Sequence, residues 1–440
     1  MNYISTSGQS PAVSFLEAAA QGLAPDGGLY MPEMIPVLPQ SFWQQEGRPT
    51  IRETGALISE QFMGSDAGVD HKKLVEDAIN FEAPLKELGD SLFLLKLFHG
   101  PTLAFKDFGA RYMARVFATP AFPGEGDVTI LVATSGDTGG AVADGFFDVP
   151  GVNVCLLYPK GKVSGIQRKQ MTTLGKNITA LEVNGNFDDC QRLVKTAFSD
   201  KELNKKIRLS SANSINIARL VPQSFYYADA WFQLKQFTNH NPVFTVPSGN
   251  FGNLTAGLLA NKMGMPVKQF IAATNSNDVV PRFLSGETFK PKPSVQTISN
   301  AMDVGSPSNF ERILHLYNRN EEQIRKEILG ASFSDDKTRA AIKRVFEETG
   351  VTFDPHTAVG ILAAEKYRHE TGNKTHPVVV LATAHPSKFK DVVEQQTGQP
   401  VQIPPRLAGA LEKEEQSIPI GRKFEELREF LDSPLPAEHS

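Results

Sequence analysis

The sequence predicts an α/β protein with mostly parallel sheets and a helical segment in front of them. From about residue 92 onward, apolar runs typical of strands alternate with helical patterns, which is the order of repeated strand–helix units. The run 128–133 is continuously apolar and rich in β-branched residues, as expected of a parallel strand with both faces covered. A glycine-rich junction and a helical pattern follow this run directly.

Residues 1–92 predict a layer of helices of their own. Apolar residues recur at helical spacing over 13–21 and again over 74–85, and a turn-rich segment at 22–32 lies between the two. We expect this lead-in to pack on the larger of the two domains that follow rather than to extend as a tail.

The remaining chain is expected to form two α/β domains, a smaller one over 93–220 and a larger one over 221–440. Strands are expected at the apolar, β-rich runs 128–133, 152–158, 178–183, 243–246, 269–273 and 377–381. Helices are expected where apolar residues recur at helical spacing, at 141–147, 164–174, 187–198, 254–263, 310–317, 336–349, 356–369 and 386–396. Residues 433–440 are expected to form a frayed tail.

The composition indicates a globular protein that acts on small molecules. The chain has 440 residues, enough for two domains with a deep cleft, and a net charge of -4. With a pI near 6.2 and no polybasic run, it has no basic field for nucleic acid or for a membrane surface. No apolar run reaches the length of a membrane span. We therefore expect neither nucleic acid nor a membrane as a partner.

The cysteines and the first residues favour a cytoplasmic protein. Cys155 and Cys190 lie far apart, and neither belongs to a CxxC motif or a Cys/His cluster, so we expect no metal site and no disulfide framework. No basic residue precedes Arg48, which argues against a signal peptide and against an arginine-rich transit peptide. The choice between a monomer and a homodimer stays open.

One lysine has the surroundings of a nucleophile. Lys106 follows the turn pair Gly100 and Pro101 and lies near the start of an expected helix, beside Phe105 and Phe108. Burial and the positive end of the helix dipole both disfavour an ammonium at such a place, and a neutral lysine reacts with aldehydes. The alternative is a solvated surface charge, the ordinary role of a lysine on an amphipathic helix.

Two junctions between a strand and a helix offer anion sites. The first, at 135–139, has the sequence Ser-Gly-Asp-Thr-Gly, and the second, at 248–253, has Ser-Gly-Asn-Phe-Gly-Asn. Glycines let backbone N–H groups approach an oxyanion, hydroxyl groups add donors, and the following helix adds its dipole. The alternative is a tight turn with a helix cap. Since neither has the spacing of a dinucleotide fingerprint or of a P-loop, the pair indicates two anionic groups on one ligand or on two adjacent ligands.

Two other segments hold side chains capable of chemistry. In 211–220, polar donors precede Arg219, an arrangement suited to a phosphate, although an ordinary helix cap looks similar. After the last expected strand come the hydroxyl of Thr383, the imidazole of His385 and the ammonium of Lys388, at the sheet edge where α/β proteins build sites. His385 taken alone is expected to be structural.

Together these motifs resemble the threonine synthase family, of the microbial and fungal type. The likeness covers nearly the whole chain, and the motifs that carry it lie at 22–28, 98–102, 103–107, 135–139, 211–220, 248–253 and 381–386. Most of them are shared with other pyridoxal-phosphate enzymes of the tryptophan-synthase-β fold type (fold type II), and the motifs at 22–28, 98–102 and 211–220 narrow the match. The resemblance implies two domains of that fold type and pyridoxal 5'-phosphate as the cofactor. It also implies the conversion of O-phospho-L-homoserine and water to L-threonine and phosphate.

The resemblance assigns roles toward the cofactor. Lys106 would hold it as a Schiff base and act as the catalytic base. The cofactor phosphate would lie against the second glycine-rich junction, at Gly249, Asn250, Phe251, Gly252 and Asn253. Thr383 would face the pyridine nitrogen, where a neutral hydroxyl leaves the ring less able to stay protonated. Asp137 would lie beside the phenolic oxygen, where asparagine is more usual in this fold type, and a carboxylate there would repel that oxygen unless it were protonated or turned away.

Two further sets would bind the substrate. Ser135 and Thr138, at a helix N-terminus, would take its α-carboxylate, and Asn213, Ser214 and Arg219 would grip its phosphate. The nearest alternative is a serine or threonine dehydratase of the same fold type, which needs no second phosphate site. A binding protein without activity is disfavoured by the retained lysine and loop glycines. A nucleotide kinase is disfavoured by the missing P-loop.

Overall fold

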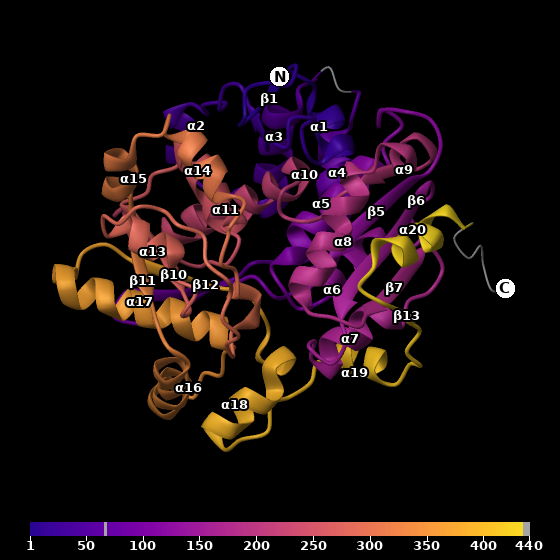
Figure 1. Ribbon diagram of the computed structural model, residues 1–440. Helices are drawn as coiled ribbons and strands as arrows, with labels where there is room; N and C mark the ends of the chain where they lie inside the picture. Colours follow the sequence, from indigo (N-terminus) through magenta and orange to yellow (C-terminus); the bar gives the residue numbers. More distant parts are fainter. Residues whose placement is uncertain (66–67, 434–440) are drawn as a thin grey trace.

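The structure is a computed structural model that describes residues 1–65 and 68–433. The frayed tail expected at 433–440 therefore lies, apart from Ser433, outside the described residues. Figure 1 shows two α/β halves side by side, with the N-terminal helices across one end. One half contains a six-stranded sheet and the other a five-stranded sheet, and strand pairing is parallel in all but one neighbouring pair of these two sheets. The predicted α/β class with mostly parallel sheets is confirmed.

The six-stranded sheet forms the half drawn mainly in orange (Figure 1). Its strand order is β11 (Ile328–Ser332), β10 (Gln269–Thr274), β9 (Val243–Pro247), β12 (Val378–Ala382), β4 (Leu92–Lys96) and β3 (Leu85–Gly89). β3 and β4 pair antiparallel at one edge. β9 and β12 lie in the middle of the sheet and are buried over their whole length, as their continuous apolar runs predict.

The five-stranded sheet is parallel throughout. Its strand order is β13 (Ile418–Ile420), β7 (Ile178–Val183), β6 (Val152–Pro159), β5 (Val128–Ala133) and β8 (Arg208–Ser210). β5 and β7 have the predicted bounds, and β5 is buried at every residue. A further two-stranded sheet, β1 (Tyr3–Ser5) with β2 (Tyr30–Pro32), belongs to the N-terminal layer.

Helices cover both sheets and make up the rest of the N-terminal layer. That layer holds α1 (Phe15–Gln21), α2 (Gln40–Gln44), α3 (Ile51–Met63) and α4 (His71–Ala78). The next helices along the chain are α5 (Lys106–Phe117), α6 (Asp137–Phe146), α7 (Gly165–Thr172), α8 (Phe187–Ser199), α9 (Lys201–Lys206), α10 (Ile217–Leu220) and α11 (Gln223–Leu234). They are followed by α12 (Gly252–Lys262), α13 (Val279–Leu284), η2 (Asn300–Met302), α14 (Phe310–Leu316), α15 (Glu321–Glu327), α16 (Asp335–Thr349), α17 (Pro355–Thr371), η3 (Pro386–Phe389), α18 (Lys390–Thr397), α19 (Pro405–Leu411) and α20 (Phe424–Asp432).

Two local predictions were wrong. The helix expected over 74–85 ends at Ala78, and β3 begins at Leu85, because Pro84 disfavours helical backbone at the residue before it. The helix expected over 386–396 is a 3₁₀ turn followed by α18. In addition, α11 was not anticipated, since all of its residues are buried and a helix without a polar face shows no amphipathic period.

The sheets cross the expected domain boundaries at 92/93 and 220/221. β4 begins at Leu92 and pairs with β12 in the six-stranded sheet. β13 pairs with β7, and α20 packs on α8, so that the end of the chain returns to the five-stranded half. Figure 1 shows this last segment, in yellow, beside the magenta strands. Pairing between strands far apart in the sequence therefore decides which half a segment belongs to.

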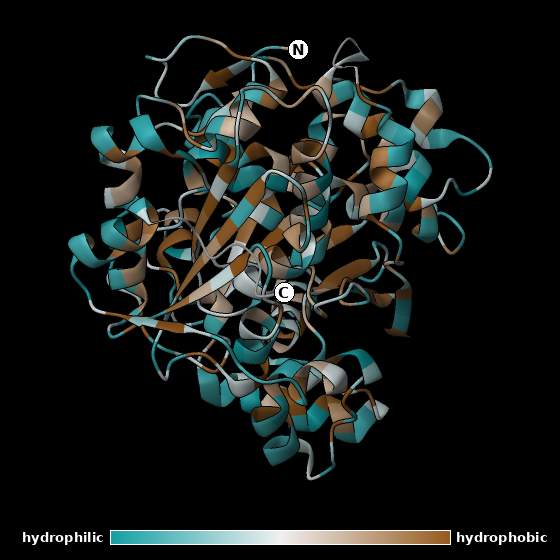
Figure 2. Ribbon diagram, turned by 90° about the vertical axis from the view of Figure 1, so that its right-hand side faces the viewer, coloured by the Kyte–Doolittle hydropathy of each residue, from teal (hydrophilic) through white to brown (hydrophobic). Residues whose placement is uncertain are grey.

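The core lies in the sheets and in the helix faces packed on them. Figure 2 shows hydrophobic residues concentrated along the strands, while the outer helices are largely hydrophilic. Within the described ranges, no helix is both long and apolar enough to cross a membrane.

Candidate active site

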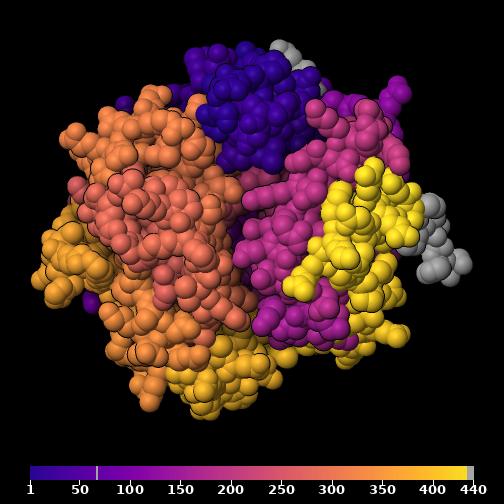
Figure 3. Space-filling model, in the orientation of Figure 1, coloured from indigo at the N-terminus to yellow at the C-terminus, as the bar shows by residue number. Residues whose placement is uncertain are grey.

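A cleft of about 980 Å³ lies between the two halves. Its lining includes residues that directly follow β5, β8, β9 and β12, and this carboxyl edge is where α/β proteins place their sites. Turns of the N-terminal layer, among them Gly27 and Gly28, line it as well. Figure 3 shows the surface hollowed where the two halves meet. The cleft brings together every residue for which the sequence predicted a cofactor or substrate role.

Lys106 enters the cleft as the first residue of α5. The segment before it pairs with the segment after β12, since Phe105 N donates to Thr383 O at 2.9 Å and His385 N donates to Leu103 O at 3.0 Å. Lys106 and Thr383 are far apart in the sequence, and this pairing places them in one wall of the cleft. The prediction that Lys106 lies near the start of a helix is confirmed.

Burial, opposed by the Asp137 carboxylate and reinforced by the neighbouring cations Lys388 and Arg219, lowers the pKa of the Lys106 amine to about 8. A larger fraction of this amine is therefore neutral at neutral pH than in a solvated lysine. The alternative of an ordinary surface charge does not fit this environment. Lys106 can act as a nucleophile toward an aldehyde.

The loop after β9 has its backbone packed closely against another segment. A Cβ on Gly249 would lie 2.6 Å from Ala301 O, so only glycine fits there. Phe251 adopts left-handed backbone with φ of 62° just before α12 begins at Gly252. The first N–H groups of a helix have no partner within it, and this one starts among residues that line the cleft. That arrangement is typical of an anion site.

Asn253 presents an unused donor beside this loop. The hydroxyl groups of Tyr226 and Tyr227 donate to its Oδ1 at 2.6 and 2.9 Å. Its Nδ2 is buried and has no partner among the described residues. The two tyrosines fix the orientation of the amide, and the free N–H group is therefore available to a ligand such as a phosphate.

The loop after β5 forms a second anion site. Thr134 Oγ1 accepts hydrogen bonds from Gly136 N at 3.0 Å and Gly139 N at 2.8 Å, which holds the turn in place. Gly136 has a φ of 142°, and a Cβ there would lie 2.5 Å from Gln167 Cδ. Ser135 and Thr138 of this turn both line the cleft, so their hydroxyls and the start of α6 can bind an anion.

Asp137, the first residue of α6, is charged and held by two donors. Lys388 Nζ and Gln167 Nε2 both lie 2.8 Å from its Oδ1. Burial alone would raise the pKa of Asp137, but Lys388, Lys106 and these hydrogen bonds hold it well below its usual range. The lowered pKa favours the carboxylate form of Asp137, and its charge is paired with Lys388.

The segment after β8 contributes a third group of donors. Arg219 is 2% exposed, it donates to Ala212 O, and its Nε has no partner in the described part of the chain. Burial lowers its pKa to about 10, so it stays cationic at neutral pH. Asn213 also lines the cleft, and its Oδ1, an acceptor, is buried without a partner among the described residues. The alternative, an arginine paired with a carboxylate on the outside of its helix, is not what the structure shows.

Ser214 connects this group to the loop after β9. Its Oγ accepts a hydrogen bond from Asn250 Nδ2 at 2.6 Å, and Asn250 Oδ1 accepts one from Ser308 N at 2.6 Å. The candidate phosphate site at 211–220 and the loop after β9 are therefore adjacent, which suits two phosphate groups on neighbouring ligands.

Several residues of the site escaped the sequence analysis or had no role there. Tyr226 and Tyr227 lie on α11, the helix without a polar face. Lys388 was noted only as a nearby ammonium. His385 is structural as expected, because its Nδ1 accepts from Ser387 N at 3.1 Å and caps η3, and burial together with His99 lowers its pKa to about 4. Within the described residues, no group of three or more His, Cys, Asp or Glu side chains is placed to hold a metal ion.

Three family models match the chain. The model described as "Pyridoxal-phosphate dependent enzyme" matches residues 78–384. "Threonine synthase N terminus" matches residues 2–78, and "Threonine synthase, C-terminal" matches residues 357–431. The three together span the described chain almost completely.

Relatives of known function are similar over nearly their whole length. The threonine synthase of Haemophilus influenzae is 42% identical over 98% of this chain and 99% of its own, and that of Serratia marcescens is 44% identical over 97% of each. Among solved structures, threonine synthase from Escherichia coli matches with a TM-score of 0.90 at 41% identity, covering 98% of this chain and 99% of that one. The PLP-bound threonine synthase of Brucella melitensis matches with a TM-score of 0.89 at 35% identity, covering 98% of each.

Proposed function

The chain belongs to the threonine synthase family of pyridoxal-phosphate-dependent enzymes, and from this we propose that its cleft converts O-phospho-L-homoserine and water to L-threonine and phosphate. The observation that supports this substrate most strongly is the second set of phosphate donors. Arg219 lies buried in the cleft without a carboxylate partner among the described residues. A dianionic substrate phosphate is the ligand that such a guanidinium suits.

Pyridoxal 5'-phosphate is the cofactor of this family, and the residues present fit it. The amine of Lys106, with its lowered pKa, suits the aldehyde. The tightly packed Gly249, the start of α12 and the free Nδ2 of Asn253 suit the 5'-phosphate. When bound, the cofactor supplies an electron-withdrawing ring that stabilises a carbanion at the substrate α-carbon.

Lys106 has two tasks in the proposed reaction. It would hold the cofactor through its amine, and with the substrate in place its free amine would take and return protons at the substrate α- and β-carbons. Thr383 lies in the same wall of the cleft, and its neutral hydroxyl would face the ring nitrogen. Ser135 and Thr138 bind the α-carboxylate and so orient the α-proton toward Lys106.

The remaining donors bind the leaving group. Asn213, Ser214 and Arg219 would hold the substrate phosphate as it leaves Cγ with the electron pair of the C–O bond. A proton is then returned to Cγ, water adds its hydroxyl group at Cβ, and a proton is returned to Cα. Ser214 is tied to Asn250 of the cofactor loop, which fixes the spacing between the two phosphates.

A serine or threonine dehydratase of the same fold type is the alternative. Such an enzyme has no use for a buried Arg219 that has no carboxylate partner among the described residues. Purified enzyme should release phosphate from O-phospho-L-homoserine and release little ammonia from L-serine or L-threonine. Fast ammonia release with no phosphate release would replace this proposal by the dehydratase.

We extend the proposal to the cellular location, the oligomeric state and the domain organisation of the protein. The protein is cytoplasmic, in keeping with the free, buried thiols of Cys155 and Cys190. It works as a monomer or a homodimer, which light scattering of the purified chain distinguishes. Its smaller domain is built around the five-stranded sheet and its larger domain around the six-stranded sheet.

A further inference from the structure

Lys388 is a buried charge that the proposed reaction does not use. It lies in η3, its side chain is 0% exposed, and it is not among the residues that line the cleft. Its Nζ lies 2.8 Å from Asp137 Oδ1 and donates to Thr102 O, also at 2.8 Å. A lysine buried this completely needs partners, and both of its partners flank Lys106 in the fold.

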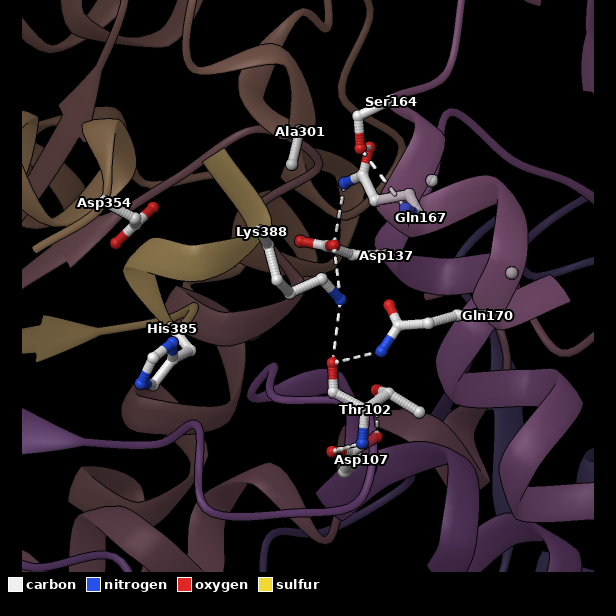
Figure 4. Close-up of polar contacts among 12 residues, drawn as sticks. Thr102, Asp107, Asp137, Ser164, Gln167, Gln170, Ala301, Asp354, His385 and Lys388 are labelled. Carbon is white, nitrogen blue, oxygen red and sulfur yellow. Dashed lines mark hydrogen bonds and ion pairs between the residues drawn. The ribbon is translucent and has the colours of Figure 1, made fainter. Parts of the chain in front are cut away.

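These contacts belong to a continuous network (Figure 4). Gln167 Nε2 donates to the same Asp137 oxygen at 2.8 Å, and Gln170 Nε2 donates to Thr102 O at 3.1 Å. Thr102 N in turn donates to Asp107 at 2.9 Å. Lys388 therefore joins the six-stranded half, where η3 follows β12, to α6 and α7 of the other half.

The charges around Lys106 come from three other elements. Asp137 lies on α6, Lys388 in η3 and Arg219 on α10, and Asp107 follows Lys106 on α5 and interacts with Lys388. Only Asp137 favours the ammonium form of Lys106. In the described part of the chain, no carboxylate lies within 4.0 Å of Lys106 Nζ, while the Oδ1 of Asp137 is engaged by Lys388 and Gln167.

We propose that Lys388 is a positioning residue for the reaction, which engages the Asp137 carboxylate and so keeps that carboxylate from capturing the Lys106 amine. The inference rests on the proposed function, since it requires Lys106 to react as a neutral amine. Without the Lys388 ammonium, Asp137 is a buried anion whose remaining cationic neighbour is Lys106. The two would pair, and the pKa of Lys106 would rise, because a nearby anion favours the charged form of an amine.

The test measures the neutral fraction of Lys106 directly. Full-length protein freed of its cofactor is treated with pyridoxal between pH 6 and pH 10, trapped with borohydride and mapped for the labelled lysine. The trapping rate at Lys106 follows the neutral amine, so it rises with pH and levels off above the pKa. Pyridoxal lacks the phosphate, and the measurement is therefore independent of the cofactor's phosphate site.

Lys388→Met is expected to move the inflection of this profile to higher pH. Trapping at pH 7 should then slow by about 10-fold for each pH unit through which the inflection moves. The double variant Lys388→Met with Asp137→Asn removes both charges and should restore the original profile. Lys390→Met is the matched control, because Lys390 lies two residues further on and pairs at 3.8 Å with Glu394 on the helix surface. Its profile should not move.

A folded Lys388→Met protein with an unchanged profile would overturn the inference and leave Lys388 a structural residue. A change that the double variant fails to reverse would also overturn it. Should Lys388→Met not fold, Asp137→Asn carries the test: it must move the inflection to lower pH, and no movement refutes the inference. Trapping that never labels Lys106 would refute the proposed function instead, so the two failures are distinguishable.

Discussion

Replacing Arg219 by leucine separates the proposed reaction from its nearest alternative. The guanidinium is 2% exposed, stays cationic because its pKa is about 10, and has no carboxylate partner in the described chain. Breaking one charged hydrogen-bonded contact in such a desolvated site costs about 2–4 kcal/mol. That range corresponds to a loss in kcat/KM of roughly 30- to 900-fold on O-phospho-L-homoserine. The cofactor's visible absorption should remain, because the residues assigned to the cofactor, among them Lys106 and Gly249, are unchanged.

The assay is phosphate release under steady-state conditions, with cofactor content measured in the same sample. Arg115→Leu is the matched control, since Arg115 also donates to a backbone carbonyl, that of Gly145, but does not line the cleft. It should leave kcat/KM unchanged. Near-normal kinetics of Arg219→Leu would refute the assignment of the substrate phosphate site and favour the dehydratase.

Three further substitutions test the residues assigned to the cofactor. Lys106→Ala should abolish turnover while the fold persists, because only one amine is lost. In the parent enzyme loaded with cofactor, borohydride reduction followed by peptide mapping should label Lys106 and no other lysine. Gly249→Ala should lower cofactor affinity roughly 10- to 100-fold, since its Cβ would lie 2.6 Å from Ala301 O and relief of such an overlap moves the loop; Gly252→Ala should do less, because its nearest neighbour would be Ser214 Cβ at 3.4 Å. Equal affinities of the two glycine variants, titrated by cofactor fluorescence, would contradict this account of the loop.

The parallel strands could be predicted because a strand buried on both faces has a recognisable local sequence. β5 and β7 have the expected bounds, since a strand covered on both faces is continuously apolar. α11 has the same burial, but a fully buried helix has no period to detect. The edge strand β3 is only partly buried and lacks such a run. Local sequence therefore identifies a strand by a short apolar run and a helix by an amphipathic period. It misses elements that show neither pattern.

The candidate site was predicted as a set of residues, and its electrostatics were not. Glycine-rich junctions and a lysine at a helix start are visible in the chain, and the fold brings them into one cleft. The charge state of Asp137 depends on Lys388, which approaches it only through the packing of the two halves. The donor orientation of Asn253 depends in the same way on Tyr226 and Tyr227. Such pairings have no local signal in a single sequence.

The central claim is that this cleft turns O-phospho-L-homoserine into L-threonine, and product analysis tests it most directly. Purified enzyme with pyridoxal 5'-phosphate is incubated with O-phospho-L-homoserine, and phosphate and amino acids are quantified in the same samples. The account predicts that L-threonine and phosphate appear in equal amounts and that Lys106→Ala yields neither. Phosphate released without L-threonine, or a keto acid and ammonia in its place, would contradict the account.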